Sequence, residues 1–417
     1  MSEGEDVVSV VGLGKAGLPL VVVVAESGLK CIGVDVNQET VDKVNSGKAP
    51  FEGEPGLEEG LQKYKGDKIV ATSDPVQGSK DSTVHIVIVP LFIDENKLPD
   101  FSIIKAAMEG VGKGLKKGDL VVLETTVPVG TTRNLVGPIL EKESGLKAGQ
   151  DFYLAYSPER IMTGYSISRF REFPKVVGGI DDASTERAFN VYRQFCKAAQ
   201  SVSSCEVAEL TKVSEGVFRD INIALANELY RVCDYYGVDF WEVREAAKHE
   251  YCNIYEPGVG VGGHCIPVYP HLIIQDLKKN EKTVPLMDTA RRVNDDMAAF
   301  FRNKMLSELA KKKISAGGAK VCVIGLSFRE GLKEDAYARS KPLINLLKQG
   351  GCKVYGADPW YSPEEIQKVY DAIPHEGKDF SDMDGIILTN KEKIYKDALL
   401  EVKDKVIVID CKNTLRD

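Results

Sequence analysis

The spacing of three glycines near the N-terminus constrains the fold of this chain more than any other feature. Val7 to Val11 is a short apolar run typical of a buried strand, and the sequence GLGKAG, ending at Gly17, follows it. The next segment, to Ser27, has the pattern of an amphipathic helix, and a second apolar run, Cys31 to Val34, ends in Asp35. This order of strand, glycine turn, helix and strand predicts the first βαβ unit of a doubly wound parallel sheet.

The same layout returns near the C-terminus. Lys320 to Gly325 predicts a strand that ends in a glycine, and Lys353 to Ala357 predicts the next strand, which ends at Asp358. Between them lies a helical pattern over Leu343 to Gln349. We therefore expect a second sheet of the same kind, although its turn holds only one glycine. The other apolar runs that predict strands are Val84 to Val89 and Leu120 to Leu123 in the first part of the chain and Ile386 to Leu388 and Val406 to Asp410 in the last.

Between these two regions the pattern is helical. Glu206 to about Tyr236 contains no proline and only Gly216 as an interior helix breaker, so it predicts one helix of roughly 45 Å. Helical patterns follow over Trp241 to Lys248 and Pro285 to Lys311. The apolar stripe of so long a helix needs a second surface, which favours a homodimer or a dimer-based higher oligomer. The expected fold class is therefore α/β, with an N-terminal Rossmann domain over residues 1–200, a central helical dimerisation region over residues 201–312 and a C-terminal Rossmann-like domain over residues 313–417.

The composition excludes several classes of protein. The 417 residues need two or three domains, and 43% hydrophobic with 28% charged residues is typical of a globular protein. A net charge of -8 argues against a nucleic-acid partner. The longest apolar run, Leu18 to Ala25, is too short to cross a membrane, and the acidic N-terminus is not a secretory signal. The nine cysteines form no CxxC pair, as is usual for thiols in a reducing compartment. From these observations together we expect a cytoplasmic protein with no membrane segment and no metal site.

The glycine turn of the first βαβ unit has the GxGxxG spacing of a dinucleotide site. Gly12 permits the tight turn, Gly14 lets the backbone approach a pyrophosphate, and Gly17 lets the helix pack closely on the strand. The pyrophosphate would lie at the helix N-terminus, where free N–H groups and the helix dipole favour anions. Asp35 follows the last glycine by 18 residues, where an acid accepts hydrogen bonds from a ribose 2′-OH and repels a 2′-phosphate. The turn therefore predicts NAD binding in preference to NADP.

One cysteine stands out in the sequence PGVGVGGHCIP, from Pro257 to Pro267. A cysteine is usually a small buried hydrophobic residue, and we expect this of most of the others. Cys265 differs because glycines precede it, and a thiol on an exposed turn beside a redox cofactor can attack an electrophilic carbon. His264 would lower the pKa of this thiol only if it were protonated and close, and adjacent side chains often point apart. The turn and the dinucleotide site together suggest oxidation through a covalent thiohemiacetal.

Other polar residues have both a structural and a functional interpretation. Lys212 in AELTKVSEG and Glu159 in SPER are ordinary surface residues unless the fold brings them to a ligand. The stretch 125–130, TTVPVG, follows a buried strand at the sheet edge where α/β proteins bind ligands, and its hydroxyl groups also suit helix caps. Three basic residues follow the second glycine turn, where guanidinium groups suit a diphosphate and a solvated charged loop is the alternative; they are Arg329, Lys333 and Arg339.

Taken together, these residues resemble the UDP-glucose/GDP-mannose dehydrogenase family over nearly the whole chain. The matching stretches are VGLGKAGLP, GVDVN, ETTVPVGTTR, YSPERI, AELTKVSEGVFRDINIALANEL, PGVGVGGHCIP, GLSFREGLKED and ARSKP. Within the family, VPLF, NIALANEL and GVGGHCIPV are similar to the UDP-N-acetyl-D-mannosamine 6-dehydrogenase branch. The UDP-glucose branch usually has serine in place of His264 and phenylalanine in place of Ile266. The resemblance implies an NAD-binding N-terminal domain and a UDP-sugar-binding C-terminal domain, in an enzyme of polysaccharide biosynthesis.

The resemblance also implies a four-electron oxidation of the C6 alcohol of a UDP-sugar to a carboxylate, with NAD as the acceptor. Cys265 would carry the thiohemiacetal and the thioester, and Lys212 would stabilise the oxyanion. Glu159 and Thr126 would position or deprotonate the hydrolytic water. The cofactor would contact Gly12, Leu13, Gly14, Lys15, Ala16, Gly17, Asp35, Pro90 and Thr126. The UDP-sugar would contact Arg160, Lys212, Arg219, Asn222, Gly262, Gly263, Arg329 and Arg339.

Three positions depart from the residues that are usual in the family. Gly216 stands where the family usually has asparagine, Tyr269 where it usually has aspartate, and Tyr251 where a neighbouring subunit usually lends an arginine. A tyrosine with an ordinary pKa of about 10 is a poor replacement for a carboxylate base. Either Lys212 shifts the pKa of the tyrosine, or a water held by Glu159 and Lys212 accepts the proton, and we favour the water.

Other functions stay open at this point. UDP-N-acetylmannosamine is the expected substrate, and UDP-N-acetylglucosamine and UDP-glucose are alternatives. A two-electron dehydrogenase of a hydroxy acid would share the first domain and the helical region, but it would need neither the C-terminal domain nor Cys265. A protein that binds NAD and a UDP-sugar without catalysis is a third alternative, which Gly216 and Tyr269 favour.

Overall fold

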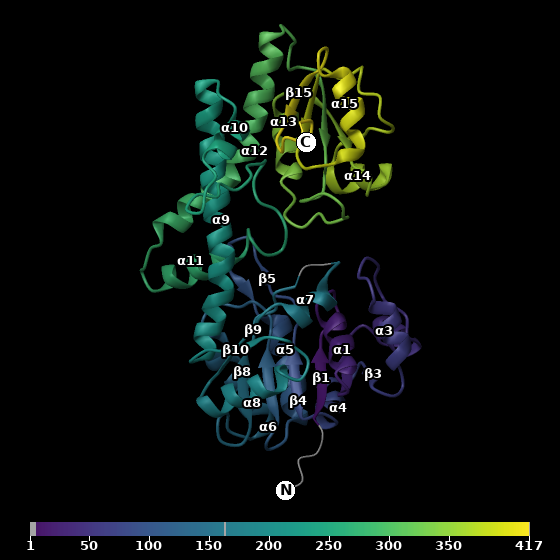
Figure 1. The fold of residues 1–417 in the computed structure, drawn as a ribbon, viewed down its shortest axis with the longest axis vertical. Coiled ribbons are helices and arrows are strands. Elements are labelled where there is room, and N and C mark those ends of the chain that lie inside the picture. Colours follow the sequence, from purple (N-terminus) through teal and green to yellow (C-terminus); the bar gives the residue numbers. More distant parts are fainter. Residues whose placement is uncertain (1–5, 162–163, 417) are drawn as a thin grey trace. The chain divides into compact units, whose positions relative to one another are not determined.

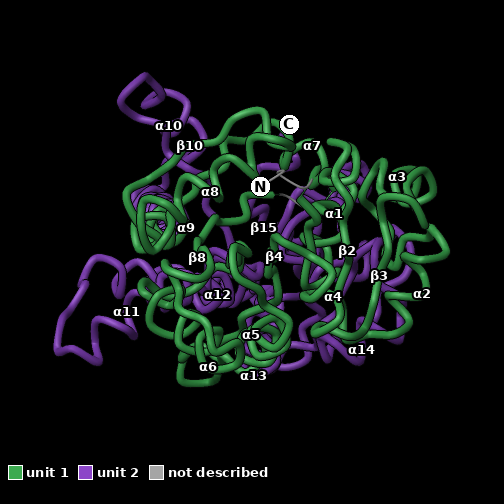
Figure 2. Tube along the Cα trace, turned by 90° about the horizontal axis from the view of Figure 1, so that it is seen from below, with its two compact units in different colours: residues 1–214 green, residues 215–417 purple. Residues whose placement is uncertain are grey.

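The computed structural model of this chain describes residues 6–161 and 164–416 (Figure 1). It divides into two compact units, residues 1–214 and residues 215–417, which Figure 2 shows in different colours. Each unit is built on a largely or wholly parallel sheet with helices, which confirms the predicted α/β fold class. The acidic N-terminal residues 1–5, on which part of the localisation argument rests, lie outside the described residues.

The first unit contains an eight-stranded sheet within the described residues. Its strands are β1 (Val7–Val11), β2 (Lys30–Val34), β3 (Ile69–Thr72), β4 (Val84–Val87), β7 (Leu120–Leu123), β8 (Tyr153–Tyr156), β9 (Lys175–Gly179) and β10 (Ala199–Ser201), and β5 (Phe92–Ile93) and β6 (Pro99–Asp100) form a separate pair. The strand order is β10-β9-β8-β7-β4-β1-β2-β3, with β8 and β9 antiparallel. The winding direction reverses between β1 and β4, which is where open α/β sheets bind ligands at their carboxyl edge.

The helices of this unit connect the strands and cover the sheet. They are α1 (Gly17–Glu26), α2 (Gln38–Ser46), α3 (Leu57–Tyr64), α4 (Pro75–Lys80), α5 (Ser102–Gly114), a π-helical turn (Thr132–Val136) that continues into α6 (Gly137–Ser144), α7 (Ser166–Glu172) and α8 (Asp182–Tyr192). The long α9 (Cys205–Tyr236) begins here and continues into the second unit. Its bounds confirm the single long helix predicted from Glu206 to Tyr236.

The helix after the glycine turn differs from the prediction. The pattern predicted an amphipathic helix up to Ser27, but α1 is buried over the whole of Gly17–Ala25. The reason is that α3 and α7 pack against it in addition to the sheet. The run Val21–Val24 is therefore suited to a helix that is covered on every side.

The second unit contains a five-stranded parallel sheet within the described residues. Its strands are β11 (Lys320–Ile324), β12 (Lys353–Ala357), β13 (Ile373–Pro374), β14 (Gly385–Leu388) and β15 (Ile407–Asp410), in the order β13-β12-β11-β14-β15. The helices are α10 (Phe240–Ala246), α11 (Tyr269–Lys279), α12 (Pro285–Lys311), α13 (Ser340–Gln349), α14 (Pro363–Tyr370), the 3₁₀ turn η2 (Lys393–Tyr395) and α15 (Lys396–Val402). Phe301 and Met305 of α12 are fully buried in a core that α12 forms with α13 and the sheet.

The turns after β1 and β11 repeat one backbone arrangement. The N–H of Gly12 donates to the carbonyl oxygen of Val34 at 2.8 Å, and the N–H of Gly325 donates to that of Ala357 at 3.0 Å. Both glycines have positive φ angles, of 101° and 84°. In each turn the residue after the glycine donates its N–H to the aspartate that follows the second strand; these pairs are Leu13 with Asp35 at 2.8 Å and Leu326 with Asp358 at 2.7 Å. The repeated layout predicted from the sequence is therefore confirmed.

Some elements were not predicted by the sequence pattern. β3, β8, β9 and β10 are short or lie near turn residues, and α11 carries Pro270 in its first turn.

In the part of the chain that the structure describes, no helix combines the length and the apolar character needed to cross a membrane.

Candidate functional site

The turn after β1 has the geometry that a dinucleotide needs. A Cβ atom at Gly12 would lie 2.7 Å from the carbonyl oxygen of Ile88, and one at Gly17 would lie 1.8 Å from the carbonyl oxygen of Gly12. Both positions therefore admit only glycine. At Gly14, apart from the chain neighbours, no described atom lies within 4 Å of the place that a Cβ would take. The backbone at Gly14 thus faces open space, as the approach of a pyrophosphate requires.

Asp35 lies directly after β2 and is held by the same turn. Its Oδ2 accepts the N–H of Leu13 at 2.8 Å, and its Oδ1 accepts the N–H of Asn37 at 2.9 Å. Each carboxylate oxygen has a further acceptor site, which a ribose hydroxyl can use. Among the described residues, no side chain caps the start of α1 at Ala16, which leaves the helix N-terminus to an anion. The residues present therefore fit NAD, held by the backbone of residues 12–17 and by Asp35.

Two further residues predicted at the cofactor site follow adjacent strands. Pro90 comes after β4 and is exposed, and Thr126 comes after β7 and is half-buried. β4 and β7 pair in parallel, and the hydroxyl of Thr125 donates to the carbonyl oxygen of Val89 at 2.6 Å. The stretch 125–130 therefore lies at the carboxyl edge of the sheet, and the hydroxyl of Thr125 joins two strand ends.

Helix α9 brings Lys212 and Glu159 together. Lys212 is only 8% exposed, and its Nζ donates to the backbone carbonyl oxygen of Glu159. The carboxylate of Glu159 accepts the N–H of Ile161. Lys212 is therefore not a solvated helix lysine, because the loop after β8 covers it.

Glu209 is a buried acid on α9 that the sequence reasoning does not single out. Its carboxylate accepts the N–H of Gly130 at 2.5 Å and that of Thr132 at 2.8 Å. Burial raises the pKa of Glu209 to about 7. Glu209 lies one turn before Lys212, so α9 holds the loops after β7 and β8 with one residue each. The signal in the sequence is the i, i+3 spacing of two charged residues on one helix face.

Glu124 is a second buried acid that the sequence reasoning does not single out. It follows β7 directly, is fully buried, and lies 2.7 Å from the Nζ of Lys175. The hydroxyl of Tyr192 donates to its other oxygen at 2.5 Å. Burial raises the pKa of Glu124, although Lys175 acts in the opposite direction. The cluster lies at the start of the loop that carries Thr126. In the sequence, its only sign is an acidic residue directly after an apolar run.

Cys265 lies on an exposed turn, as predicted. It is exposed and Cys252 is half-buried, whereas the other cysteines are buried. The carbonyl oxygen of Cys265 accepts the N–H of Val268 at 3.1 Å and that of Tyr269 at 3.0 Å. The imidazole of His264 lies 3.3 Å from the carboxylate of Glu334, so this side chain is engaged by an acid.

The glycines before Cys265 are required by close packing within the second unit. A Cβ at Gly262 would lie 2.6 Å from the Cβ of Phe328, and one at Gly263 would lie 3.0 Å from the ring of the same residue. Gly263 also has a φ of 90°, and its N–H donates to the carbonyl oxygen of Ala336 at 2.8 Å. The glycine run therefore lies against the loop after β11, which contains the predicted basic residues.

The three basic residues of that loop have different partners in the structure. Arg339 donates to the carbonyl oxygen of Asp295 at 2.7 Å, and its Nε would lie 2.9 Å from a Cβ at Gly260. The guanidinium of Arg329 lies 5.7 Å from the ring centroid of Phe328. Arg339 thus borders the glycine run at Gly260. Lys333 forms an ion pair with Glu365 on α14 at 2.6 Å, and its contact with a diphosphate stays a prediction.

Three other predicted substrate residues bind main-chain groups or are exposed in this structure. Arg160 donates to the carbonyl oxygen of Pro174 at 3.2 Å, and Asn222 donates to that of Phe218 at 2.7 Å. Arg219 is exposed on α9. Their contacts with a sugar nucleotide remain predictions.

Ser9, His85 and Asp119 form a chain of hydrogen bonds that resembles a catalytic triad. The Oγ of Ser9 lies 2.9 Å from Nδ1 of His85, and Nε2 of His85 lies 3.2 Å from the carboxylate of Asp119. All three side chains are buried, so a substrate does not reach the serine. Burial lowers the pKa of His85. The chain therefore joins β1, β4 and the residue before β7 as a structural element.

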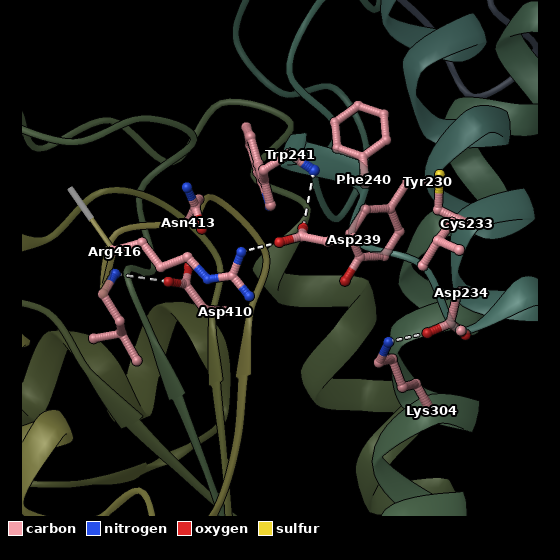
Figure 3. A pocket seen from close by; sticks show the side chains of 13 residues that line it. Tyr230, Cys233, Asp234, Asp239, Phe240, Trp241, Lys304, Asp410, Asn413 and Arg416 are labelled. Carbon is pink, nitrogen blue, oxygen red and sulfur yellow. Dashed lines mark hydrogen bonds and ion pairs between the residues drawn. The ribbon is translucent and has the colours of Figure 1, made fainter. Parts of the chain in front are cut away.

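A pocket of about 450 Å³ in the second unit lies between the end of α9, α10, α12 and the C-terminal segment (Figure 3). Lys304 pairs with Asp234, and Arg416 pairs with Asp239. The two basic side chains of the pocket wall are thus each compensated by an acid. These pairs attach the C-terminal segment to the start of α10 and one long helix to the other.

All three domains of one protein family match the chain in order. The family is the UDP-glucose/GDP-mannose dehydrogenase family: its NAD binding domain matches residues 6–196, its central domain residues 206–296 and its UDP binding domain residues 322–417. The UDP-N-acetyl-D-mannosamine dehydrogenase of Pyrococcus horikoshii is 31% identical over 419 residues, which cover 98% of this chain and 96% of that protein. The UDP-N-acetyl-D-glucosamine 6-dehydrogenase of Pseudomonas aeruginosa is 34% identical, with 93% and 91% covered.

A solved structure agrees in fold as well as in sequence. The UDP-D-ManNAc dehydrogenase structure from Pyrococcus horikoshii matches with a TM-score of 0.86 and 31% identity, covering 98% of this chain and 95% of that one. Two sheets, one largely and one wholly parallel, with repeated glycine turns define a nucleotide-binding protein of the Rossmann type. The chain belongs to the UDP-glucose/GDP-mannose dehydrogenase family and is an NAD-dependent nucleotide-sugar dehydrogenase.

Proposed function

We propose that this enzyme oxidises the C6 alcohol of UDP-N-acetylmannosamine to the carboxylate, which gives UDP-N-acetylmannosaminuronate. The observation that carries the proposal is Cys265, an exposed thiol on a glycine turn in a chain that also has a dinucleotide turn. The names of the two relatives, one a mannosamine and one a glucosamine enzyme, support a UDP-sugar with an N-acetyl group. UDP-N-acetylglucosamine and UDP-glucose are the alternative substrates.

The proposed chemistry divides the four-electron oxidation into two hydride losses from C6. Bound NAD supplies the hydride acceptor, and two molecules are reduced for each sugar. Between the two losses the sulfur of Cys265 adds to the aldehyde carbon, and the resulting thiohemiacetal becomes a thioester when the second hydride leaves. Water then displaces the thiol and yields the acid. We assign the oxyanion to Lys212 and the positioning of the water to Glu159 and Thr126.

The proposed substrate contacts involve the diphosphate and the rest of the sugar nucleotide. We assign the diphosphate to Arg329 and Arg339, since guanidinium groups bind phosphate oxygens in a fork and Arg339 borders the glycine run at Gly260. The remaining proposed contacts come from Arg160, Lys212, Arg219, Asn222, Gly262 and Gly263. In this proposal residues 1–200, 201–312 and 313–417 act as the NAD-binding, helical and UDP-sugar-binding domains.

The test is a panel of UDP-sugars with NAD, scored for NADH and for the acid product. UDP-N-acetylmannosamine should give about two NADH per sugar and the uronate. A ratio near one with accumulation of the aldehyde would refute the four-electron reaction. Cys265→Ser should abolish acid formation, whereas Cys252→Ser, at a half-buried cysteine outside the turn, should retain it. Unchanged acid formation by the Cys265 variant would remove the thiol from the mechanism.

We also propose that the enzyme is a homodimer or a dimer-based oligomer. Phe218, Leu225 and Val232 repeat every seven residues on α9 and are each about half exposed, which is a stripe that a second copy would cover. Light scattering should give at least twice the chain mass, and Leu225→Glu should lower it, whereas Glu109→Lys at an exposed position of α5 should not. The unpaired thiols support a cytoplasmic location, because such cysteines persist in a reducing compartment.

A further inference from the structure

Two of the three residues that depart from the usual family residues, Gly216 and Tyr269, lie against each other. Tyr269 is the first residue of α11 and is 8% exposed. A Cβ at Gly216 would lie 2.5 Å from Cδ2 of the Tyr269 ring and 2.9 Å from the Cβ of the same tyrosine. Carbon atoms in contact are ordinarily about 3.5–4.0 Å apart. Tyr269 therefore fills the space beside α9 that a side chain at position 216 would take.

The tyrosine cannot make room by a small change of its own. A rotation about its Cα–Cβ bond moves the ring but leaves the Cβ in place, and this Cβ is itself within the contact distance. Relief of the clash would need a shift of the backbone at the start of α11. The absence of a side chain at Gly216 is therefore a condition for the observed position of Tyr269.

The backbone at Tyr269 also belongs to the turn of the nucleophile. The N–H of Tyr269 donates to the carbonyl oxygen of Cys265 at 3.0 Å, and the N–H of Val268 donates to the same oxygen at 3.1 Å. A shift at the start of α11 would lengthen these bonds and move Cys265. Contact between Gly216 and Tyr269 is thus transmitted to the thiol over one short turn.

We propose that Gly216 on α9 and Tyr269 on α11 are an interlocked pair whose contact holds the turn of Cys265 against α9. In this proposal Tyr269 is a positioning residue and not the proton acceptor. The inference rests on the proposed function, because the turn matters for catalysis only if Cys265 is the nucleophile. The atoms of Tyr269 that meet position 216 are the Cβ and the ring carbons Cγ and Cδ2. These two of the three departures from the family are accordingly linked: the larger residue on α11 occupies the volume that a side chain on α9 would take.

The first experiment measures the pair without substrate, by thermal unfolding of the full-length protein. Alanine ordinarily stabilises a helix interior relative to glycine, so helix propensity alone would raise the Tm of Gly216→Ala. A lower Tm for this variant would therefore report the clash with Tyr269. Ser214→Ala, at an exposed position of the same helix, is the matched control and should change little. Gly216→Asn and Tyr269→Asp should each lower the Tm, and the double variant should lose much less than the sum. Additive losses, or a raised Tm for Gly216→Ala, would overturn the interlock.

The second experiment measures acid formation with NAD and the UDP-sugar that the wild type uses. Gly216→Ala should lower kcat by about tenfold to a hundredfold with little change in KM for NAD, because the turn of Cys265 moves and the NAD turn does not. Tyr269→Phe keeps the ring and should retain kcat within about threefold, with an unchanged pH profile. A loss of about a hundredfold in kcat for Tyr269→Phe at unchanged Tm would make the hydroxyl a proton-transfer group and would refute the positioning role. If the wild type forms no acid from any UDP-sugar, the proposed function fails, whereas the unfolding cycle still decides the interlock.

Discussion

The side-chain amide of Asn294 donates to the carboxylate of Asp220 at 2.8 Å, in a polar network whose members are all buried. Asn227 donates to the carbonyl of the same amide at 2.8 Å, and Arg291 donates to Asp220 at 2.5 Å. Asn227 in turn accepts the N–H of Gly258 at 2.9 Å, and Gly258 is the start of the glycine run before Cys265. Buried polar networks of this kind specify a single arrangement, so α9 and α12 together fix where the glycine run begins.

The network predicts a large effect of Asn294→Asp. The variant replaces a donor that faces Asp220 with a carboxylate, so two acids would meet in a buried place and hydrogen bonds would be lost. We expect a decrease of about 3 kcal/mol in the free energy of unfolding, measured with denaturant. Asn303→Asp, an exposed position of the same helix, should change it by less than about 0.5 kcal/mol. Similar losses for the two variants would contradict the network.

The glycines of the first turn should separate folding from cofactor binding. Gly17→Ala places a Cβ against the carbonyl oxygen of Gly12 and should lower the Tm strongly. Gly14→Ala meets open space and should leave the Tm nearly unchanged, but its methyl group would occupy the approach of the pyrophosphate. Calorimetric titration with NAD should therefore show weakened binding by a well-folded Gly14 variant. Unaltered NAD affinity in that variant would place the pyrophosphate elsewhere.

Asp35 should set the preference between NAD and NADP. Asp35→Asn keeps the shape of the side chain and an acceptor for the N–H of Leu13 but removes the charge. We expect NAD binding to weaken by about tenfold and NADP binding to weaken less or improve, since repulsion of a 2′-phosphate is lost. Dissociation constants for both cofactors provide the measurement. Asp42→Asn, on the exposed side of α2, should leave both constants unchanged, and an equal effect of the two variants would argue against a specific contact.

Glu209 predicts a pH dependence of stability with a definite sign. Burial raises the pKa of Glu209 in the folded protein to about 7 from an ordinary 4.5, so the folded state binds this proton more tightly than the unfolded state. Its contribution to stability is complete below about pH 4.5 and is lost as the pH rises to about 7, with a total of about 3 kcal/mol. Glu209→Gln should remove this part of the decline, as measured by denaturant unfolding at several pH values. Burial also raises the pKa of Glu392 to about 7, but that acid is present in both proteins and cancels in the difference. Parallel pH profiles would exclude Glu209 as the source.

The local pattern predicts elements whose residues determine them over short distances. The bounds of β1, β12 and α12 agree with the predicted runs because period and flanking turn residues lie within the element itself. The burial of α1 could not be predicted in this way. An apolar helix next to a sheet looks one-sided until α3 and α7, from later parts of the chain, cover its outer side. The site shows the same limit: Lys212 meets Glu159 across 53 positions, and Glu209 meets Gly130 across 79.

The sequence by itself determined the two Rossmann-type layouts, the long α9 and the cofactor, and it singled out Cys265, because each depends on the spacing of a few residues along a short segment. Tertiary structure alone decided what those residues face. It turned Lys333 to Glu365, engaged His264 with Glu334 and placed Tyr269 on Gly216. Such contacts join segments that are distant in the chain, and close packing selects among the partners that the residue types allow. Two substitutions that look like separate losses in the sequence are for this reason a single contact in the folded protein.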